Sequence, residues 1–352
     1  MLPLTKVLNP NPGWYRGDFH LHTTSSDGHY SPQTLARLAL AEGLDFFAIT
    51  DHNSIGSFGK FSEESGLLVI PGIEITLAEG HWNVFGIQGQ PEWLSEVCVW
   101  DKQLATKDLT GSITELMIQI AKSGMLNSIN HPLLKPWEWQ DGTTQLEHIH
   151  CLEIWNDPFW PDNAQANPAA VDMWTRWLNA GFRITAIGGS DFHFLPGEIS
   201  GYPGERPGLP ATYVYAKNLS SVAILEGLRL GRVYVSMGPQ ICLEVACGEQ
   251  QGTLGTDYGL VSGPLDFRIR VDGAPEGSFA RLIKNGEEIT RFSLNDEQSA
   301  HQFRDALDRS RCWYRLDLND QSGQILAVTN PVYAGPQREL SNLTFVDLMF
   351  SV

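Results

Sequence analysis

The segment GDFHLHTTSSDG, residues 17–28, places two histidines and an aspartate in and just after a short apolar stretch. Neighbouring side chains of a β-strand point to opposite faces of the sheet. A strand over residues 18–23 would therefore bury its Phe and Leu side chains and project His20 and His22 together from the other face. Followed by Asp27, the pair predicts half of a metal site. The alternative is a histidine pair that only forms hydrogen bonds at the end of a sheet.

Length and composition indicate a protein with a substantial core and two domains. The chain has 352 residues, of which 42% are hydrophobic and 18% charged, and a domain usually holds about 100–200 residues. The sequence has no apolar run of about 18 residues that would span a membrane. The segment before residue 15 lacks the cationic start and apolar core of a secretory signal. We therefore predict a cytoplasmic protein without membrane association.

The charge balance restricts the partners that the protein can bind. A formal net charge of −17 argues against a nucleic-acid or anionic-membrane surface. It is compatible with a small anionic substrate, because bound divalent cations can invert the sign of a pocket. The five cysteines show no CxxC spacing, so neither a disulfide framework nor a thiolate zinc site is expected. The sequence gives no indication of the oligomeric state.

Residues 17 to about 235 alternate short apolar strands with amphipathic helices. The candidate strands are 18–23, 45–51, 67–75, 82–87, 126–130, 151–155 and 183–189. Capping residues and glycines bound the candidate helices, which run from Ser31-Pro32 to Gly43, from Ser112 with Glu115 to Gly124, from Asn167-Pro168 to Gly181, and from Ser220 to Gly231. This alternation predicts parallel strands, and more than five such units favour a barrel over an open sheet.

The pattern changes after Gly238-Pro239. Short alternating runs follow, separated by Gly, Asn and Asp turns, and Asn285-Gly286 is typical of a two-residue hairpin. The section 296–310 is expected to hold a short helix or a loop. We predict an antiparallel, immunoglobulin-like β-sandwich here, with domains at 1–238 and 239–352.

Polar residues with metal-binding side chains recur where the predicted strands end, which is where barrel active sites are built. The candidate metal ligands are His20, His22, Asp27, His52, Glu74, His81, His131, Asp191 and His193. A single histidine of this kind is more often a satisfied polar residue, but so many at one rim predict a metal centre. Imidazoles mixed with carboxylates suit Zn²⁺, Mn²⁺ or Fe²⁺ better than Ca²⁺ or Mg²⁺. A bridging carboxylate such as Glu74 would hold two ions close enough to share a nucleophilic hydroxide.

Four short motifs in a fixed order resemble those of the polymerase-and-histidinol-phosphatase (PHP) metallohydrolase family. They are His20-Leu21-His22-Thr23, Thr50-Asp51-His52-Asn53, Pro71-Gly72-Ile73-Glu74 and Ser190-Asp191-Phe192-His193. The finer pattern is similar to the carbaryl-hydrolase-like branch of that family, in the motifs Tyr15-Arg16-Gly17-Asp18, Gly80-His81-Trp82-Asn83, Glu153-Ile154-Trp155-Asn156, Gly231-Arg232-Val233-Tyr234 and Thr329-Asn330-Pro331. The resemblance covers residues 14–238 strongly and the remainder weakly.

This resemblance implies a distorted (β/α)7 barrel with up to three divalent metal ions. By position, the first ion would be held by His20, His22, Glu74 and Asp191. Glu74 would bridge to a second ion held by His81 and His131, and the third would be held by Asp27, His52 and His193. We predict Asp51, Glu74 and Asp191 as catalytic residues, although Asp51 would equally serve as a hydrogen-bond acceptor at a strand end.

The expected activity is metal-dependent hydrolysis of a small phosphoester, as the wider family implies. The runner-up is hydrolysis of a carboxylic or carbamate ester, which the nearer branch and the aromatic loops at 132–145 and 155–166 favour. A phosphoesterase needs cationic groups, for which Arg16, Arg183 and Arg206 are the candidates. A metal-bound scaffold without catalytic activity is the third reading.

Overall fold

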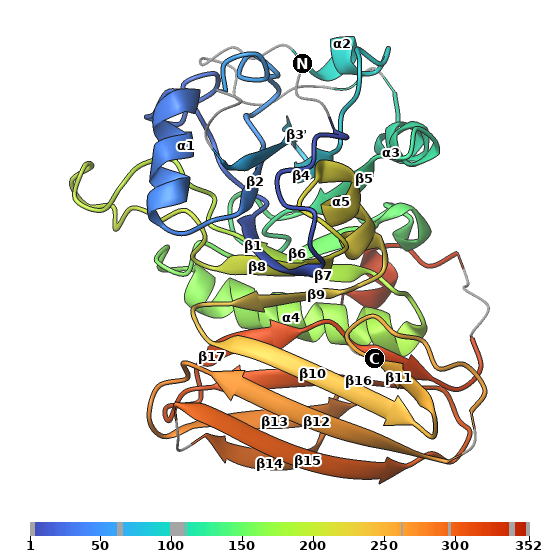
Figure 1. Ribbon diagram of the computed structural model, residues 1–352. Coiled ribbons are helices and arrows are strands. Elements are labelled where there is room, and N and C mark those ends of the chain that lie inside the picture. The colour runs from blue at the N-terminus through green and yellow to red at the C-terminus, as the bar shows by residue number, and fades with distance from the viewer. Residues whose placement is uncertain are drawn as a thin grey trace.

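The computed structural model describes residues 4–61, 66–98, 109, 111–261, 263–294, 297–337 and 342–349. Strands and helices alternate in the first two thirds of the chain, and strands dominate the rest (Figure 1). The predicted α/β class with a β-rich second part is therefore confirmed. None of the helices in the described ranges has the length and apolar character that are needed to cross a bilayer.

The first part of the chain contains nine strands and five α-helices among the described residues. They are β1 (Gly13–Asp18), α1 (Pro32–Ala41), β2 (Phe46–Ile49), β3 (Leu68–Leu77), β4 (Gly80–Phe85), α2 (Leu94–Val97), α3 (Ile113–Lys122), β5 (Leu126–Ile129), β6 (Cys151–Asn156), α4 (Asn163–Ala180), β7 (Thr185–Gly189), β8 (Ala211–Ala216), α5 (Ser221–Arg229) and β9 (Val233–Ser236). A 3₁₀ turn, Leu146–His148, precedes β6.

Local sequence signals explain most helix ends. The Ser31 side chain caps α1, and Ser112 and Glu115 form the expected capping box of α3. The prediction for α4 was wrong at its start, because the helix begins at Asn163 and Pro168 lies inside it. The side chains of Asn163 and Asn167 donate hydrogen bonds to Asn156 at the end of β6. These tertiary contacts set the start of the helix, and the proline does not mark it.

The strands of the first part form a strongly curved sheet around the rim where the predicted ligands lie. The pairs β1–β2, β2–β3, β5–β6 and β6–β7 are parallel, whereas β4 runs antiparallel to both of its neighbours, β3 and β5. A parallel bridge between Leu21 and Phe192 joins the chain segments that follow β1 and β7. It brings the first and last metal-binding motifs side by side.

The first predicted strand was misplaced. The structure ends β1 at Asp18, so His20 and His22 follow the strand instead of lying within it. The alternation nevertheless persists, because Phe19 and Leu21 are fully buried in apolar clusters. His20 and His22 are also buried, and their rings lie 5.2 Å apart.

The remaining strands form two antiparallel layers that share an apolar core (Figure 1). They are β10 (Gln240–Cys247), β11 (Gln250–Gly252), β12 (Pro264–Asp272), β13 (Ser278–Lys284), β14 (Glu287–Leu294), β15 (Gln298–Ala306), β16 (Cys312–Asn319), β17 (Ile325–Thr329) and β18 (Val332–Ala334). The Asn285-Gly286 hairpin joins β13 to β14 as predicted, with φ of 52° and 92°. The expected helix or loop over 296–310 was wrong, because β15 occupies most of that section.

Hydrogen bonding is continuous between the two parts. Strand β17 pairs with β9, so the order β14-β13-β16-β17-β9-β8-β1 carries the sheet from the C-terminal layers to the first strand. The other layer has the order β11-β10-β12-β15. A boundary at residues 238 and 239, the (β/α)7 barrel and the immunoglobulin-like sandwich stay predictions.

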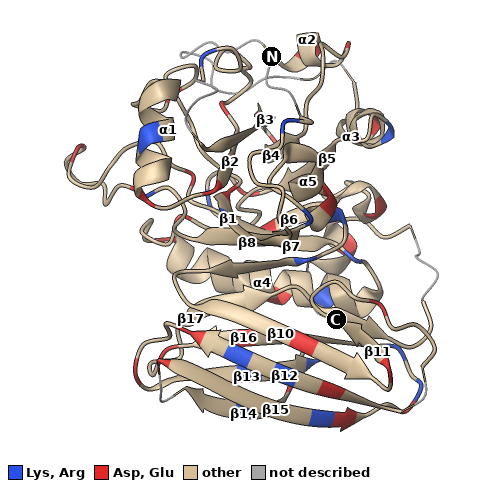
Figure 2. Cartoon of the chain, in the orientation of Figure 1, with Lys and Arg blue, Asp and Glu red and all other residues tan. Residues whose placement is uncertain are grey.

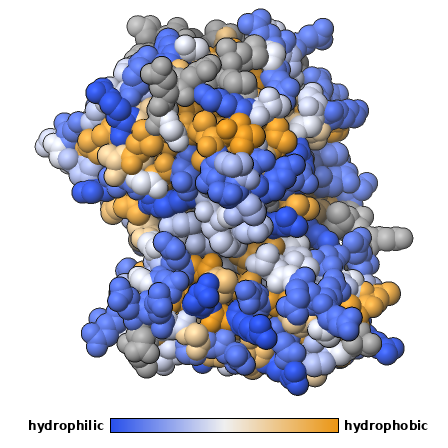
Figure 3. All heavy atoms as spheres, viewed as in Figure 1, coloured by the Kyte–Doolittle hydropathy of each residue, from blue (hydrophilic) through white to orange (hydrophobic). Residues whose placement is uncertain are grey.

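Charged residues of both signs are interspersed over the two parts (Figure 2). On the face shown in Figure 3, hydrophobic side chains gather over the first part, and the C-terminal strands are mostly hydrophilic. On this face, no block of basic residues of the kind that nucleic-acid surfaces use stands out among the described residues (Figure 2).

Candidate metal centre

The cluster is built around the carboxylate of Glu74. This residue lies in the middle of β3, all ten residues of which are buried. Its Oε1 atom is 3.2 Å from His20 Nε2 and 3.3 Å from His81 Nδ1. Its Oε2 atom is 2.9 Å from His52 Nδ1. One carboxylate therefore faces imidazoles from three separate segments of the chain.

Asp191 completes one side of the cluster. It lies two residues after the end of β7 and adopts a positive φ of 53°, a conformation that non-glycine residues rarely take. Its Oδ1 atom lies 3.0 Å from His22 Nε2 and 3.2 Å from His20 Nε2. His131, after β5, also has a positive φ and places its Nε2 atom 3.6 Å from Glu74. Unusual backbone conformations of this kind concentrate at functional sites.

A third group of side chains lies at the outer edge of the cluster. Asp27 has a 42% exposed side chain, and its carboxylate is 3.4 Å from His193 Nε2 and 3.6 Å from His52 Nε2. The Nδ1 atom of His22 lies 3.9 Å from Asp27 Oδ1. The structure thus brings all nine residues predicted as ligands into one connected cluster.

Electrostatic coupling shifts the pKa of the central groups strongly. Burial acts to raise the pKa of Glu74, but His20, His52 and His81 together hold it well below its ordinary value. Burial acts to lower the pKa of His20, but the neighbouring carboxylates raise it well above normal. Burial lowers the pKa of His81 to about 4. The opposite directions of the shifts of Glu74 and His20 follow from the attraction between the carboxylates and the imidazoles around them.

The donor set fits divalent metal ions. Five buried side-chain atoms of the cluster make no well-aligned hydrogen bond to the described residues, although three of them lie within 3.5 Å of another ligand atom: His20 Nε2, His22 Nδ1, Glu74 Oε2, His81 Nδ1 and His131 Nδ1. Leaving a buried polar atom unpaired costs roughly 1–3 kcal/mol. Three groups of these side chains have ligand atoms within 4.8 Å of one another. Metal coordination would satisfy atoms that the folded chain leaves unsatisfied.

A layer of hydrogen bonds holds the cluster residues in place. Glu153 of β6 accepts a bond from His20 Nδ1 at 2.9 Å and one from the His131 backbone N–H at 2.8 Å. Asn130 donates to Glu74 at 2.8 Å, and Asn156 donates to both Glu153 and Asp191. Such partners orient metal-binding imidazoles and fix their tautomers.

Asp51 lies next to His52 in a buried, hydrogen-bonded environment. It is fully buried and accepts hydrogen bonds from the backbone and hydroxyl of Thr23 and from the hydroxyl of Ser26. These bonds tie the loop after His22 to the end of β2. This geometry fits the strand-end acceptor that the sequence offered as an alternative, and the catalytic role of Asp51 stays a prediction.

A cavity of about 250 Å³ opens onto the cluster. Its outer wall is aromatic, with the rings of Trp137 and Trp160 5.7 Å apart and those of Trp160 and Tyr202 5.5 Å apart. Among the described residues that line it, none is Lys or Arg. Two of the rim tryptophans predicted from the sequence lie elsewhere, because Trp139 is buried and Trp155 faces another cavity.

Sequence reasoning missed two carboxyl groups of this cavity. Asp157 follows the last residue of β6, and Glu205 accepts hydrogen bonds from the backbone N–H groups of His193 and Phe194. Burial, reinforced by Glu205, raises the pKa of Asp157 to about 8. Their place in rim loops next to the metal motifs is the only signal that the sequence offers for them.

The three candidate arginines lie outside the cavity lining. Arg16 donates to the carbonyl groups of Glu42 and Gly208. Arg183 pairs with Asp257 at 2.8 Å, and Arg206 is half exposed. The expected cationic clamp is therefore not formed by these residues.

Comparison with known proteins finds similarity to curated relatives over short stretches. The chain is 43% identical over 70 residues to the 5'-3' exoribonuclease Rnm of Salmonella typhimurium and 36% identical over 73 residues to a 5'-3' exoribonuclease of Haemophilus influenzae. These matches cover 18% and 20% of this chain, and they span about a quarter of each relative, 24% and 26%.

Two solved structures align with more of the chain, at low sequence identity. A two-domain protein from Bacteroides vulgatus that contains a predicted PHP-like metal-dependent phosphoesterase is 19% identical, with a TM-score of 0.48, and covers 94% of this chain and 99% of its own. An amidohydrolase from Chromobacterium violaceum is 15% identical, with a TM-score of 0.39 and coverage of 54% and 90%. The family model of the PHP domain matches residues 18–152, the region that supplies seven of the nine clustered residues.

Proposed function

We propose that the protein is a metal-dependent hydrolase that cleaves a small phosphoester at the cluster around Glu74. The observation that carries this proposal is the set of buried, unsatisfied imidazole and carboxylate atoms that converge on one point. The PHP domain match over the same region supports it. The distorted (β/α)7 barrel, the two-domain division and the carbaryl-hydrolase-like branch are part of the same proposal.

The nine clustered residues suit up to three ions of Zn²⁺, Mn²⁺ or Fe²⁺. We assign His20, His22, Glu74 and Asp191 to the first, Glu74 with His81 and His131 to the second, and Asp27, His52 and His193 to the third. Bound ions of this type lower the pKa of water and stabilise negative charge on the attacked group.

The residues of the chain itself position these groups and the substrate. Glu153 fixes the His20 ring so that its Nε2 atom faces Glu74 and Asp191. Asn130 orients the Glu74 carboxylate. The aromatic wall at Trp137 and Trp160 offers a surface for a planar or apolar leaving group.

Hydrolysis of a carboxylic or carbamate ester is the second candidate. It is favoured by the lack of Lys and Arg among the described residues that line the cavity. A phosphate dianion would have to be neutralised by metal ions alone, whereas a neutral ester needs no such compensation. Phosphodiesters carry one negative charge and lie between these cases. The exoribonuclease relatives, though matched only in part, justify including a short RNA among the substrates.

The experiment compares nitrophenol release from nitrophenyl phosphate, bis(nitrophenyl) phosphate, nitrophenyl acetate and a nitrophenyl carbamate by Mn²⁺- or Zn²⁺-loaded protein. Cleavage of a short RNA by the same protein is measured beside them. Metal-dependent preference for a phosphoester supports the proposal, and preference for the acetate or carbamate supports the second candidate. His20→Ala and Asp191→Ala should abolish turnover, and His301→Ala in β15 serves as the control. Unchanged hydrolysis in both cluster variants would refute both readings. Tight substrate binding without turnover would indicate a scaffold.

A further inference from the structure

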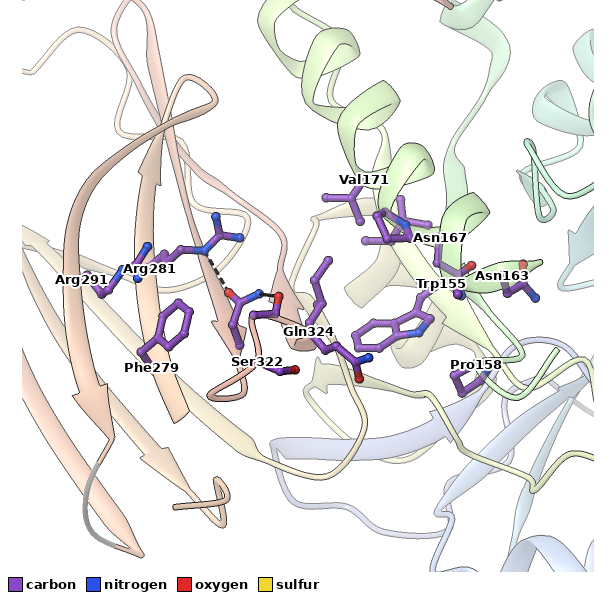
Figure 4. Close-up of a pocket in the computed structure, with 16 residues that line it drawn as sticks. Trp155, Pro158, Asn163, Asn167, Val171, Phe279, Arg281, Arg291, Ser322 and Gln324 are labelled. Atoms are coloured by element: carbon purple, nitrogen blue, oxygen red, sulfur yellow. Dashed lines mark hydrogen bonds between the residues drawn. The ribbon is translucent and has the colours of Figure 1, made fainter. Parts of the chain in front are cut away.

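A second and larger cavity lies between the first part of the chain and the C-terminal strands. Its volume is about 650 Å³, within the range of cavities that hold small organic ligands. Figure 4 shows that one wall comes from the end of β6 and the start of α4, and the other from β13, β14 and the turn before β17. It is separate from the cavity at the metal centre, because no described residue lines both: Ile154 and Trp155 line this cavity, whereas Asn156 and Asp157 line the other.

The cavity offers apolar and aromatic surface on both sides. Trp155 lies on the β6 side, and Phe279 lies opposite on β13 (Figure 4). Phe279 and Arg281 alternate along β13 with Ala280 and Leu282 of the sandwich core. Phe279 and Arg281 therefore face away from that core and toward α4. Planar rings bind well between such surfaces.

The charge near this wall is positive, in contrast to the protein as a whole. Arg281 lies 3.4 Å from Asp317 and 4.0 Å from Glu288. Arg291 pairs with the same Glu288, and Arg315 with the same Asp317. Three guanidinium groups thus share two carboxylates, and two of the three, those of Arg281 and Arg291, belong to residues that line the cavity. No Asp or Glu is among the described residues that line the cavity.

One buried polar atom at the cavity has no partner. Asn163, 1% exposed, donates from Nδ2 to Asn156 Oδ1 at 3.1 Å and to the Asp157 carbonyl at 2.9 Å. Its Oδ1 atom has no hydrogen-bond partner among the described residues. A buried acceptor of this kind calls for a donor from outside the folded chain.

We propose that this cavity binds a small organic anion with a planar apolar body, at a site distinct from the metal centre. The rings of Trp155 and Phe279 contact the planar body, and Arg281 binds the anionic group. Arg281 is suited to this because both of its carboxylate contacts are long, while its Nε atom donates to Asn319 at 2.9 Å and so orients the guanidinium group. A hydrogen-bond donor on the ligand or a bridging water satisfies Asn163 Oδ1.

The probe for the experiment is 1-naphthoate, compared with 1-naphthalenemethanol, which has the same ring system and no charge. Calorimetric titration of the full-length protein is expected to show saturable binding of one 1-naphthoate per chain, about tenfold tighter than the alcohol. The titration is run on metal-loaded and on chelator-treated protein, and equal affinity is expected. This readout does not depend on whether the metal centre hydrolyses phosphoesters.

Three variants locate the site. Arg281→Gln should weaken 1-naphthoate about tenfold and leave the alcohol unchanged, and Ala164→Phe, which fills the exposed mouth of the cavity, should weaken both. Arg304→Gln, on an exposed part of β15 and paired with Asp266, is the matched control. The proposal is refuted if no saturable binding occurs at low millimolar concentration, if Arg281→Gln binds normally, or if chelation abolishes binding, since the probe then occupies the metal centre.

Discussion

Replacing Glu153 by Gln should weaken metal binding without changing the size of the side chain. The Glu153 carboxylate accepts bonds from His20 Nδ1 at 2.9 Å, from the His131 N–H at 2.8 Å and from Asn156 at 3.2 Å. A glutamine has only one acceptor oxygen. If its amide nitrogen faces His20, it donates to Nδ1 and forces the ring proton onto Nε2, the atom that faces Glu74 and Asp191.

The size of the effect follows from the bond that is lost. A hydrogen bond to a charged group contributes about 1.5–3 kcal/mol, and 1.4 kcal/mol corresponds to a factor of ten in affinity. The affinity for the first ion should therefore fall roughly 10- to 150-fold, in line with the effect of removing partners of metal-binding histidines. Competition with a chelating dye for Mn²⁺ or Zn²⁺ measures this change, and elemental analysis gives the number of ions per chain.

The matched control is Glu147→Gln, on an exposed carboxylate that lies 3.8 Å from His148 and away from the cluster. It should bind metal as the unmodified protein does. Circular dichroism confirms that both variants are folded. Normal affinity in a folded Glu153→Gln protein would show that the bond to His20 does not set its tautomer.

Three further variants test the surroundings of the cluster. Asn330→Ala removes the two 2.8 Å bonds between its buried amide and the backbone of Ala186 in β7, so the free energy of unfolding in urea should fall by about 3 kcal/mol. Gly189→Ala would place a methyl group 2.4 Å from the Cβ atom of His20, and dye competition should show that metal binding is lost. Burial lowers the pKa of His150 to about 4, so its contribution to stability is complete above pH 6.5 and is lost as the pH falls toward 4, whereas His150→Gln should unfold with a weaker dependence over that interval.

Each of these expectations has a clear contrary result. Native stability of Asn330→Ala would mean that water replaces the amide at β7. Native metal affinity of Gly189→Ala would mean that β7 shifts to admit the methyl group. An identical pH dependence with and without the imidazole of His150 would assign the acid sensitivity to other groups.

The sequence predicted that these residues lie together, because several of them belong to short motifs just after buried strands. Parallel strands bring their carboxyl ends to one rim, so His52, His131 and Asp191 could be placed together without knowing the register of the sheet. The role of Asp51 could not be decided this way. Its hydrogen bonds come from Thr23 and from a loop whose path the sequence does not specify.

Other features were missed because tertiary contacts override local signals. Strand β15 pairs with β12 along nine residues, yet its own residues are mostly polar, so no alternation of apolar residues marks it. The start of α4 depends on bonds to the end of β6, and Pro168 suggested a later start. The second cavity forms between segments more than a hundred residues apart, a distance at which sequence patterns say nothing.

The pairing of β17 with β9 has a practical consequence for truncated proteins. A version that ends at Gly238 would lose β17 and present the backbone of Val233–Ser236 as an open edge. Open edges of apolar strands recruit other chains, which leads to aggregation. All four residues of β9 are buried in the full-length protein. Expression of the metal-binding part alone is therefore expected to give insoluble material, unless a designed strand or a charged substitution protects that edge.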